Sequence, residues 1–212
     1  MKDGLRELFT DKEIVKKIKR GLPELFQLAE RESSRAGKIG MEIGSVRERI
    51  MIALLIYKFG KNNIKTDNPI TEPETDVIVY GKPISIKTIT GKKLGGVKLI
   101  WTVDSKKALF FRETYVPSCD MLLVQINWGD KGWFFYIPKT VQEKAIETLG
   151  RKNYIKLPKK GTNPRGVEIT KEALRLLTTD KDTMNIEIDW QRKKIEYNVY
   201  DKWIEYWSKT VN

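Results

Sequence analysis

One stretch of the sequence, residues 75–87, constrains the fold most, because it reads as a strand, a tight turn and a second strand. If Gly81-Lys82 forms the loop, a Gly-first turn of the type II′ kind, Asp76 is expected directly opposite Lys87. Cross-strand partners have Cβ atoms about 4.5–5.5 Å apart, and Ser85 should share their face because side chains alternate along a strand. The hairpin therefore predicts a carboxylate beside an ammonium group, an arrangement that can hold Mg²⁺ and a water molecule next to a phosphodiester.

The composition points to a polyanionic partner and excludes imidazole chemistry. The 212 residues include 40 Lys and Arg against 28 Asp and Glu, a net charge of +12, which makes nucleic acid the first candidate; a lysine-rich proteome would explain the charge equally well. There is no histidine and one cysteine, Cys119, so Ser-His-Asp and Cys-His catalysis and the usual zinc sites are excluded. Any hydrolysis must use carboxylates, lysine and a hard cation, and oxygen ligands favour Mg²⁺ or Mn²⁺.

The hydrophobic pattern predicts one domain over residues 1–212, an α/β fold with a mixed sheet flanked by helices. We expect a helical part over 1–60, the main sheet over 61–140 and a closing part that binds DNA over 141–212. The expected helices are Lys12–Lys19, Pro23–Glu32, Ser45–Phe59, Thr140–Leu149, Thr170–Leu177 and a C-terminal helix that carries Trp203 and Trp207. The expected later strands are Lys98–Val103, Met121–Trp128, Trp133–Pro138, and Met184–Asp189 paired with Lys194–Val199 as a closing hairpin.

The sequence gives no sign of a membrane segment or of export. Its longest apolar run, Ile50–Tyr57, is too short to cross a bilayer, and the first residues lack the apolar core of a signal peptide. We therefore expect an intracellular protein of the cytoplasm.

A second carboxylate of interest lies on the helix that begins near Ser45. The expected core stripe of that helix is Val46, Ile50, Ala53, Leu54 and Tyr57, while Glu48 has Ile52 and Leu55 as neighbours at helical spacing. Alone, Glu48 is better explained as a solvated residue between Arg47 and Arg49, or as the partner of one of them. The hairpin changes this balance, because a metal ion needs more than the one carboxylate of Asp76.

The hairpin resembles the signature of the PD-(D/E)xK nucleases, in which an Asp opens one strand and (D/E)-x-K closes the next. The matching positions are Asp76 and Ser85-Ile86-Lys87. Thr75 stands where the motif has proline, a residue without a chemical role. Ser85 replaces the second acid, as in some restriction endonucleases of this superfamily that take the carboxylate from a nearby helix.

The resemblance implies roles for four residues. Glu48 is the acid supplied by the helix, and it binds Mg²⁺ together with Asp76 and the backbone carbonyl of Ile86. Lys87 orients the attacking water and helps to remove its proton. The implied fold is the restriction-endonuclease-like core.

Residues 41–48, followed by Asp76 and Lys87, resemble the ThaI type of restriction endonuclease. That group cuts both strands within CGCG and leaves blunt ends, so the resemblance implies a type II enzyme that acts as a homodimer on duplex DNA. It also implies that Met41 enters the DNA from the minor groove between two bases. From the residues alone, Met41 is better explained as a core residue beneath the helix start.

Two basic stretches are candidates for contact with DNA. One follows the second strand of the hairpin, and the other is a proline-containing loop in the last third of the chain. Both are equally well explained as solvated loops. With Arg47 on the helix, the expected DNA-binding residues are Lys92, Lys93, Lys159, Lys160 and Arg165, of which Arg165 suits a bidentate contact to guanine.

Other polar residues leave alternatives open. Glu74 shares the strand face of Asp76 and is either a helper near the metal or an exposed charge. Gln125 either faces the site from the next strand or is buried against backbone groups. We interpret Asp104, in a literal D-x-K sequence, as a helix cap.

Two other functions compete with a restriction enzyme. A Holliday junction resolvase would share the hairpin and the positive charge. In a DNA-binding protein without catalysis, Asp76 and Lys87 would form only a cross-strand ion pair, which contributes little when exposed.

Overall fold

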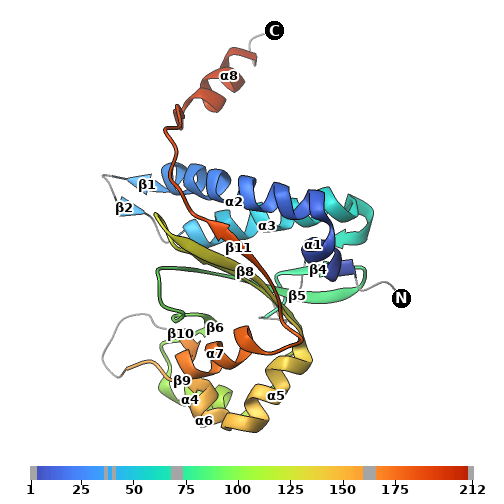
Figure 1. Cartoon of the computed structure of the whole chain (residues 1–212). Coiled ribbons are helices and arrows are strands. Elements are labelled where there is room, and N and C mark those ends of the chain that lie inside the picture. The colour runs from blue at the N-terminus through green and yellow to red at the C-terminus, as the bar shows by residue number, and fades with distance from the viewer. Residues whose placement is uncertain (1–3, 36–37, 40–41, 68–73, 160–165, 210–212) are drawn as a thin grey trace.

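A mixed six-stranded sheet crosses the centre of the computed structural model, which describes residues 4–35, 38–39, 42–67, 74–159 and 166–209 (Figure 1). Its strand order is β11-β8-β7-β5-β4-β3. Strands β5 and β7 are parallel, and the other neighbouring pairs are antiparallel. The strands are β3 (Ile64–Lys65), β4 (Val77–Val79), β5 (Lys82–Thr90), β7 (Asp120–Ile126), β8 (Lys131–Ile137) and β11 (Met184–Asp189).

Helices from the start of the chain cover one face of this sheet (Figure 1). They are α1 (Glu7–Thr10), α2 (Lys12–Glu32) and α3 (Ile43–Phe59), with the short 3₁₀ helices Gly4–Arg6 and Lys61–Asn63 and the small strands β1 (Ser34–Arg35) and β2 (Lys38–Ile39) beside them. The Asp11 carboxylate caps α2 by accepting from the backbone N–H groups of Glu13 and Ile14.

The predicted break before Pro23 is wrong, since α2 runs through it. A proline removes one hydrogen bond inside a helix. Here the stripe formed by Ile14, Ile18, Leu22 and Phe26 is buried along the same helix face, and its burial outweighs that loss.

The predicted core stripe of α3 is also wrong. The buried residues are Arg47, Met51, Leu55 and Phe59, whereas Tyr57 is 63% exposed. Apolar residues occupy every position from Ile50 to Ile56, so the periodicity does not identify one face. Packing between α2 and β5 selects it.

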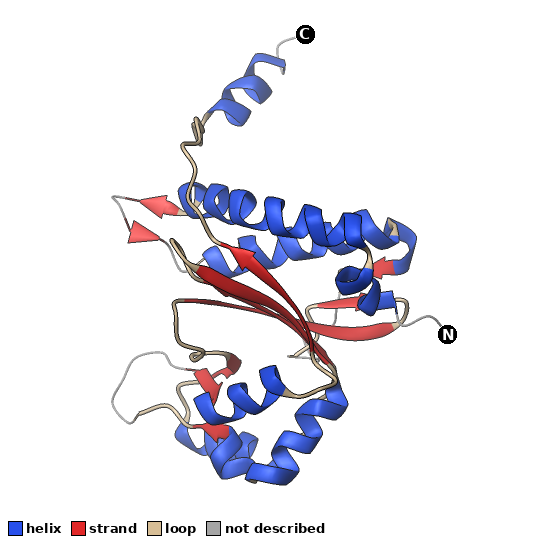
Figure 2. Ribbon diagram, viewed as in Figure 1, coloured by secondary structure: helices blue, strands red, loops and turns tan. Residues whose placement is uncertain are grey.

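A second layer covers the opposite face of the main sheet (Figure 2). It contains a three-stranded sheet of order β6-β10-β9 and is built around a second core cluster that includes Leu123, Phe135 and Leu174. Its elements are β6 (Lys98–Trp101), α4 (Ser105–Thr114), α5 (Lys139–Leu149), α6 (Arg151–Tyr154), β9 (Ile155–Lys156), β10 (Gly166–Ile169) and α7 (Lys171–Thr179). Asp104 caps α4 and Thr170 caps α7, as predicted.

The C-terminal segment departs from the prediction. β11 pairs with β8, and residues 194–199 form no strand, so the closing hairpin is wrong. The segment passes along α2, where Gln27 exchanges hydrogen bonds with the backbone of Lys193 and Arg31 donates to the Ile195 carbonyl. The last described element is α8 (Asp201–Lys209), which projects from the body (Figure 1). In the described part of the chain no helix is both long and apolar enough to cross a membrane.

The predicted fold class is confirmed. The chain folds as a mixed α/β structure in which helices flank a mixed sheet on both faces (Figure 2).

Candidate active site

The hairpin of β4 and β5 is present, but its turn differs from the predicted one. Val77 pairs with Ile84 and Val79 with Lys82, so the loop is Tyr80-Gly81. Both loop residues have positive φ, 50° and 78°, as in a type I′ turn, which matches the twist of the strands. Tyr80 is held in this conformation because its ring packs on Phe59 at 5.6 Å and its N–H donates to Asn63.

The new register moves Asp76 opposite Ser85 and makes Lys87 a diagonal neighbour, a separation that a long side chain still spans. The Lys87 ammonium lies 3.1 Å from Asp76 Oδ2. The same oxygen accepts from the backbone N–H of Ile86 at 2.5 Å and from the Ser85 hydroxyl at 3.3 Å. Asp76 and Lys87 are therefore brought together as predicted, although the predicted direct pairing is wrong.

The Asp76 carboxylate accepts a hydrogen bond from the edge of β5 where pairing with β4 has ended. β4 pairs with β5 only up to Ile84, so among the described residues the edge of β5 beyond Ile84 has no strand neighbour on this side. Ile86 donates its N–H there to Asp76. Because the N–H and C=O of one strand residue point to the same neighbour, the Ile86 carbonyl also points to this open edge.

Helix α3 brings Glu48 to the same edge. Burial first, and the Asp76 carboxylate second, raise the pKa of Glu48, while Lys87 and Arg49 act in the opposite direction. Glu48 is thus half-buried and close enough to interact with Asp76 and Lys87, in contrast to the solvated alternative. A half-buried carboxylate beside a second carboxylate is a suitable environment for a divalent cation.

The donor set fits Mg²⁺. The oxygen donors near this edge are two carboxylates, Asp76 and Glu48, and the Ile86 carbonyl; within the described residues no group of three or more His, Cys, Asp and Glu side chains gathers as a metal site. Mg²⁺ commonly takes one or two carboxylates and completes its coordination with water.

Glu48, Ile86 and Lys87 line a cavity of about 350 Å³. Its opposite wall comes from the loop before β6 and from β6, where the Lys98 ammonium lies 3.7 Å from the centre of the Trp101 ring. Trp101 is 64% exposed. Trp101 could not be found from the sequence, because strand alternation does not show that β6 faces this edge of β5.

The loop before β6 is the basic loop that follows β5, and its first part lines a second cavity. Lys92 and Lys93 are exposed and line this cavity of about 590 Å³ together with Trp133 and two basic residues of α7, Lys171 and Arg175. The Gln125 amide donates to the backbone carbonyls of Gly91 and Lys92 at 3.1 and 3.0 Å. Gln125 is therefore bonded to backbone groups of this loop. This agrees with one of the two alternatives for Gln125, burial against backbone groups.

Glu74 is a buried structural carboxylate. It accepts from the Tyr115 hydroxyl at 2.7 Å and from the backbone and hydroxyl of Ser118 at 3.1 and 2.7 Å. Both of its oxygens are bonded in this way, so the exposed alternative is wrong and no contact to the metal site follows from this geometry.

The residues predicted to contact DNA differ in their exposure. Arg47 is only 5% exposed and forms an ion pair with Glu30 at 2.7 Å, so its prediction as a DNA contact is wrong. Lys159 is exposed. Met41, Lys160 and Arg165 lie outside the described residues.

Comparisons with known proteins agree over almost the whole chain. The family model of restriction endonuclease ThaI matches residues 8–209. A solved structure described as a restriction endonuclease in complex with substrate DNA has a TM-score of 0.91 and 57% sequence identity, and the match covers 98% of this chain and 100% of that chain. No curated protein matches.

Proposed function

The chain belongs to the ThaI family of restriction endonucleases and is a type II, site-specific DNA nuclease, and we propose that it makes Mg²⁺-dependent double-strand cuts at CG/CG that leave blunt ends. The observation that carries the metal-dependent part is the convergence of Glu48, Asp76 and Lys87 on one open strand edge. The CGCG site is what the resemblance to the ThaI type implies.

In this proposal Asp76, Glu48 and the Ile86 carbonyl hold Mg²⁺. When bound, the ion offsets negative charge on the phosphate and lowers the pKa of a coordinated water. Asp76 is fixed for this task because its Oδ2 already accepts from Ile86, Ser85 and Lys87, which leaves Oδ1 free of these three contacts. A preorganised ligand loses little freedom when the ion binds.

Lys87 has two tasks. Its ammonium, held 3.1 Å from Asp76, donates to the attacking water and orients it toward phosphorus. It also faces the negative charge that grows on the phosphate oxygens as the water attacks. Ser85 supports the site through its bond to Asp76.

The proposed substrate is duplex DNA, since the similar solved structure is described in complex with substrate DNA and this chain carries a net charge of +12. A palindrome cut on both strands presents two phosphates related by a two-fold axis, so we propose a homodimer with one site per copy. Lys92, Lys93 and Lys159 are the proposed phosphate contacts of the described residues. Since the proposed substrate is DNA within the cell, we also propose that the enzyme acts in the cytoplasm.

The test is digestion of plasmid DNA with sequencing of the ends. Wild type should give discrete blunt-ended fragments cut inside CGCG that disappear when Mg²⁺ is removed. Asp76→Asn should bind DNA without cutting it, whereas Asp182→Asn, on an exposed turn, should cut like wild type. Cutting by Asp76→Asn would remove this site from the reaction, and cutting only of four-way junctions would favour a resolvase.

A further inference from the structure

A single buried carboxylate, that of Glu30, joins three parts of the structure. It is 4% exposed. Its Oε1 accepts from Arg47 Nη2 of α3 at 2.7 Å and from Trp128 Nε1, after β7, at 2.8 Å. Its Oε2 accepts from Arg192 Nη2 of the C-terminal segment at 2.6 Å. Glu30 therefore meets the catalytic helix through one oxygen and the C-terminal segment through the other.

Arg47 extends this connection to the catalytic strand. Its Nη1 donates to the Thr90 hydroxyl at 3.1 Å, and Thr90 is the last residue of β5, the strand that carries Lys87. Its guanidinium also lies 5.7 Å from the centre of the Phe26 ring of α2. One side chain thus fixes α3 against both α2 and β5.

The position of Arg47 sets the direction of Glu48. Arg47 is the first residue of the buried stripe that continues through Met51, Leu55 and Phe59, and each residue of a helix is rotated by about 100° from the one before. Apolar packing at Met51 and Leu55 is not directional, whereas a forked guanidinium has fixed geometry. The pair with Glu30 therefore determines the rotation of α3 at the end where Glu48 lies.

Stability alone does not explain the buried ion pair between Glu30 and Arg47, for two reasons. Burial is the main cause that lowers the pKa of Arg47, and its Nε has no hydrogen-bond partner within the described structure. Apolar residues of similar volume often replace a buried ion pair without loss of stability. The geometry that the pair imposes explains its presence better.

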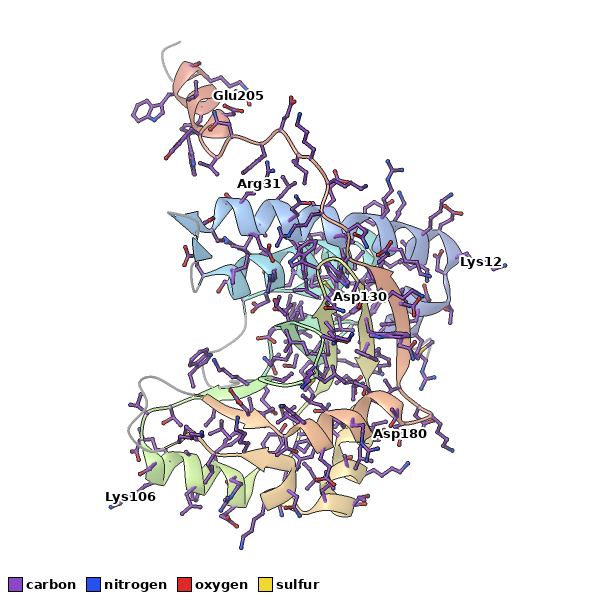
Figure 3. The ribbon with its side chains drawn as sticks, turned by 60° about the vertical axis from the view of Figure 1, so that its left-hand side comes forward. Lys12, Arg31, Lys106, Asp130, Asp180 and Glu205 are labelled. Atoms are coloured by element: carbon purple, nitrogen blue, oxygen red, sulfur yellow. The ribbon has the colours of Figure 1, made fainter. Side chains whose placement is uncertain are left out.

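The C-terminal segment completes the environment of Glu30. Besides Arg192, it is held by Gln27, which donates to the Lys193 carbonyl at 2.7 Å and accepts from the Lys193 N–H at 2.9 Å. Arg31 donates to the Ile195 carbonyl and lies at the end of α2 beside this segment (Figure 3). The segment is therefore fastened to α2 on both sides of Glu30.

We propose that Glu30 is a positioning residue of the enzyme: it holds Arg47, and through Arg47 it aims Glu48 at the metal site, while Arg192 of the C-terminal segment completes this support. The inference rests on the proposed role of Glu48 in metal binding. It adds that the C-terminal segment contributes to the assembly of the catalytic edge.

The test replaces the ion pair by an apolar pair, Glu30→Met with Arg47→Met. The double variant should melt close to wild type, because the two other donors to Glu30, Trp128 and Arg192, are only partly buried and can turn to water, and it should bind a CGCG duplex in Ca²⁺ like wild type. Its cleavage rate at saturating DNA should fall by about 10–100-fold, and the Mg²⁺ concentration for half-maximal rate should rise, as for other residues that orient metal ligands. If Glu30 and Arg47 served only to stabilise the fold, a double variant of wild-type stability should also cleave DNA at the wild-type rate.

The matched control is Glu24→Met with Lys193→Met, which removes an exposed ion pair, 4.0 Å long, between the same helix and the same segment. It should cut like wild type. If the Glu30 and Arg47 double variant also cuts at the wild-type rate while Asp76→Asn is inactive, the inference is overturned and the proposed function stands. If Asp76→Asn cuts, the proposed site itself fails, and the inference fails with it.

A further variant covers the case in which the double variant does not fold. Arg192→Gln changes a side chain that is 49% exposed, so it leaves no cavity in the core. It should raise the Mg²⁺ concentration for half-maximal cleavage without changing DNA affinity in Ca²⁺. An unchanged Mg²⁺ dependence would overturn the inference.

Discussion

The Glu48 carboxylate, which we propose binds the metal ion, is expected to lower the stability of the metal-free protein at neutral pH. Burial, and then the charge of Asp76, raise its pKa above the ordinary glutamate value. A carboxyl group with a higher pKa in the folded chain binds its proton more tightly there. The free energy of unfolding therefore falls as the pH rises from about 4.3, the ordinary glutamate pKa, through the raised value.

We predict that Glu48→Gln stabilises the metal-free protein while it abolishes cutting. At neutral pH the gain should be less than about 1 kcal/mol, because solvent screens a half-exposed group. The gain should disappear below about pH 4, where both side chains are neutral. Urea denaturation in EDTA at the two pH values measures it. Glu42→Gln, an exposed change at the start of the same helix, is the control, and a Glu48→Gln protein less stable than wild type at neutral pH would contradict the prediction.

Single residues of the site differ in how far the sequence predicts them. Asp76 and Lys87 follow from the hairpin, because even a shifted register leaves them within reach of each other. Glu48 needed the resemblance to a nuclease family, since a helical glutamate between two arginines reads as solvated. Arg47 was misplaced because its burial depends on Glu30, a partner from another helix that no local pattern reveals.

At the level of elements, the errors share one cause, which is a partner distant in sequence. The turn at Tyr80-Gly81 was missed because a tyrosine with positive φ is unfavourable alone, and here Phe59 and Asn63 hold it. Residues 194–199 alternate like a strand, but Arg31 of α2 donates to the Ile195 carbonyl, and Gln27 holds the backbone of Lys193 just before them. Caps such as Asp104 and Thr170 were predicted correctly because their partners lie within three residues.

The sheet itself contains one position where a methyl group cannot fit. A Cβ on Gly132 of β8 would lie 2.3 Å from the Gln125 carbonyl oxygen and 2.6 Å from Trp190 Nε1, and Trp190 is completely buried. Neither a backbone carbonyl nor a core tryptophan can move away easily. Gly132 thus allows β7, β8 and the Trp190 side chain to approach closely.

We predict that Gly132→Ala lowers the free energy of unfolding by about 3 kcal/mol or more, at the upper end of the cost of overpacking. Gly21→Ala is the matched control, because its Cβ meets nothing within 4 Å in the middle of α2. It should raise stability by about 0.5–1 kcal/mol through helix propensity. Thermal denaturation of both variants measures the difference, and equal effects of the two changes would refute the packing argument.

Over the whole molecule, the basic loop after β5 occupies a central place. Its Gly96 and the nearby Lys98 line the cavity that also contains Glu48 and Lys87, while Lys92 and Lys93 line the cavity against α7. The loop therefore stands between the catalytic edge and the second layer. A DNA backbone that reaches Asp76 would pass close to these exposed ammonium groups, which makes them better candidates for phosphate contacts than lysines on the outer surface of α2.

The salt dependence of binding tests this placement. Each phosphate neutralised by a lysine contributes about −0.9 to the slope of log K against log salt concentration, so Lys92→Ala with Lys93→Ala should reduce the slope by about 2. Lys12→Ala with Lys16→Ala removes the same charge from the far end of α2, where Lys12 is labelled (Figure 3), and should leave the slope nearly unchanged. Titration of a fluorescent CGCG duplex in Ca²⁺ over a range of salt concentrations measures both. Equal losses in the two variants would mean that net charge alone, rather than the loop beside the catalytic edge, draws DNA to this protein.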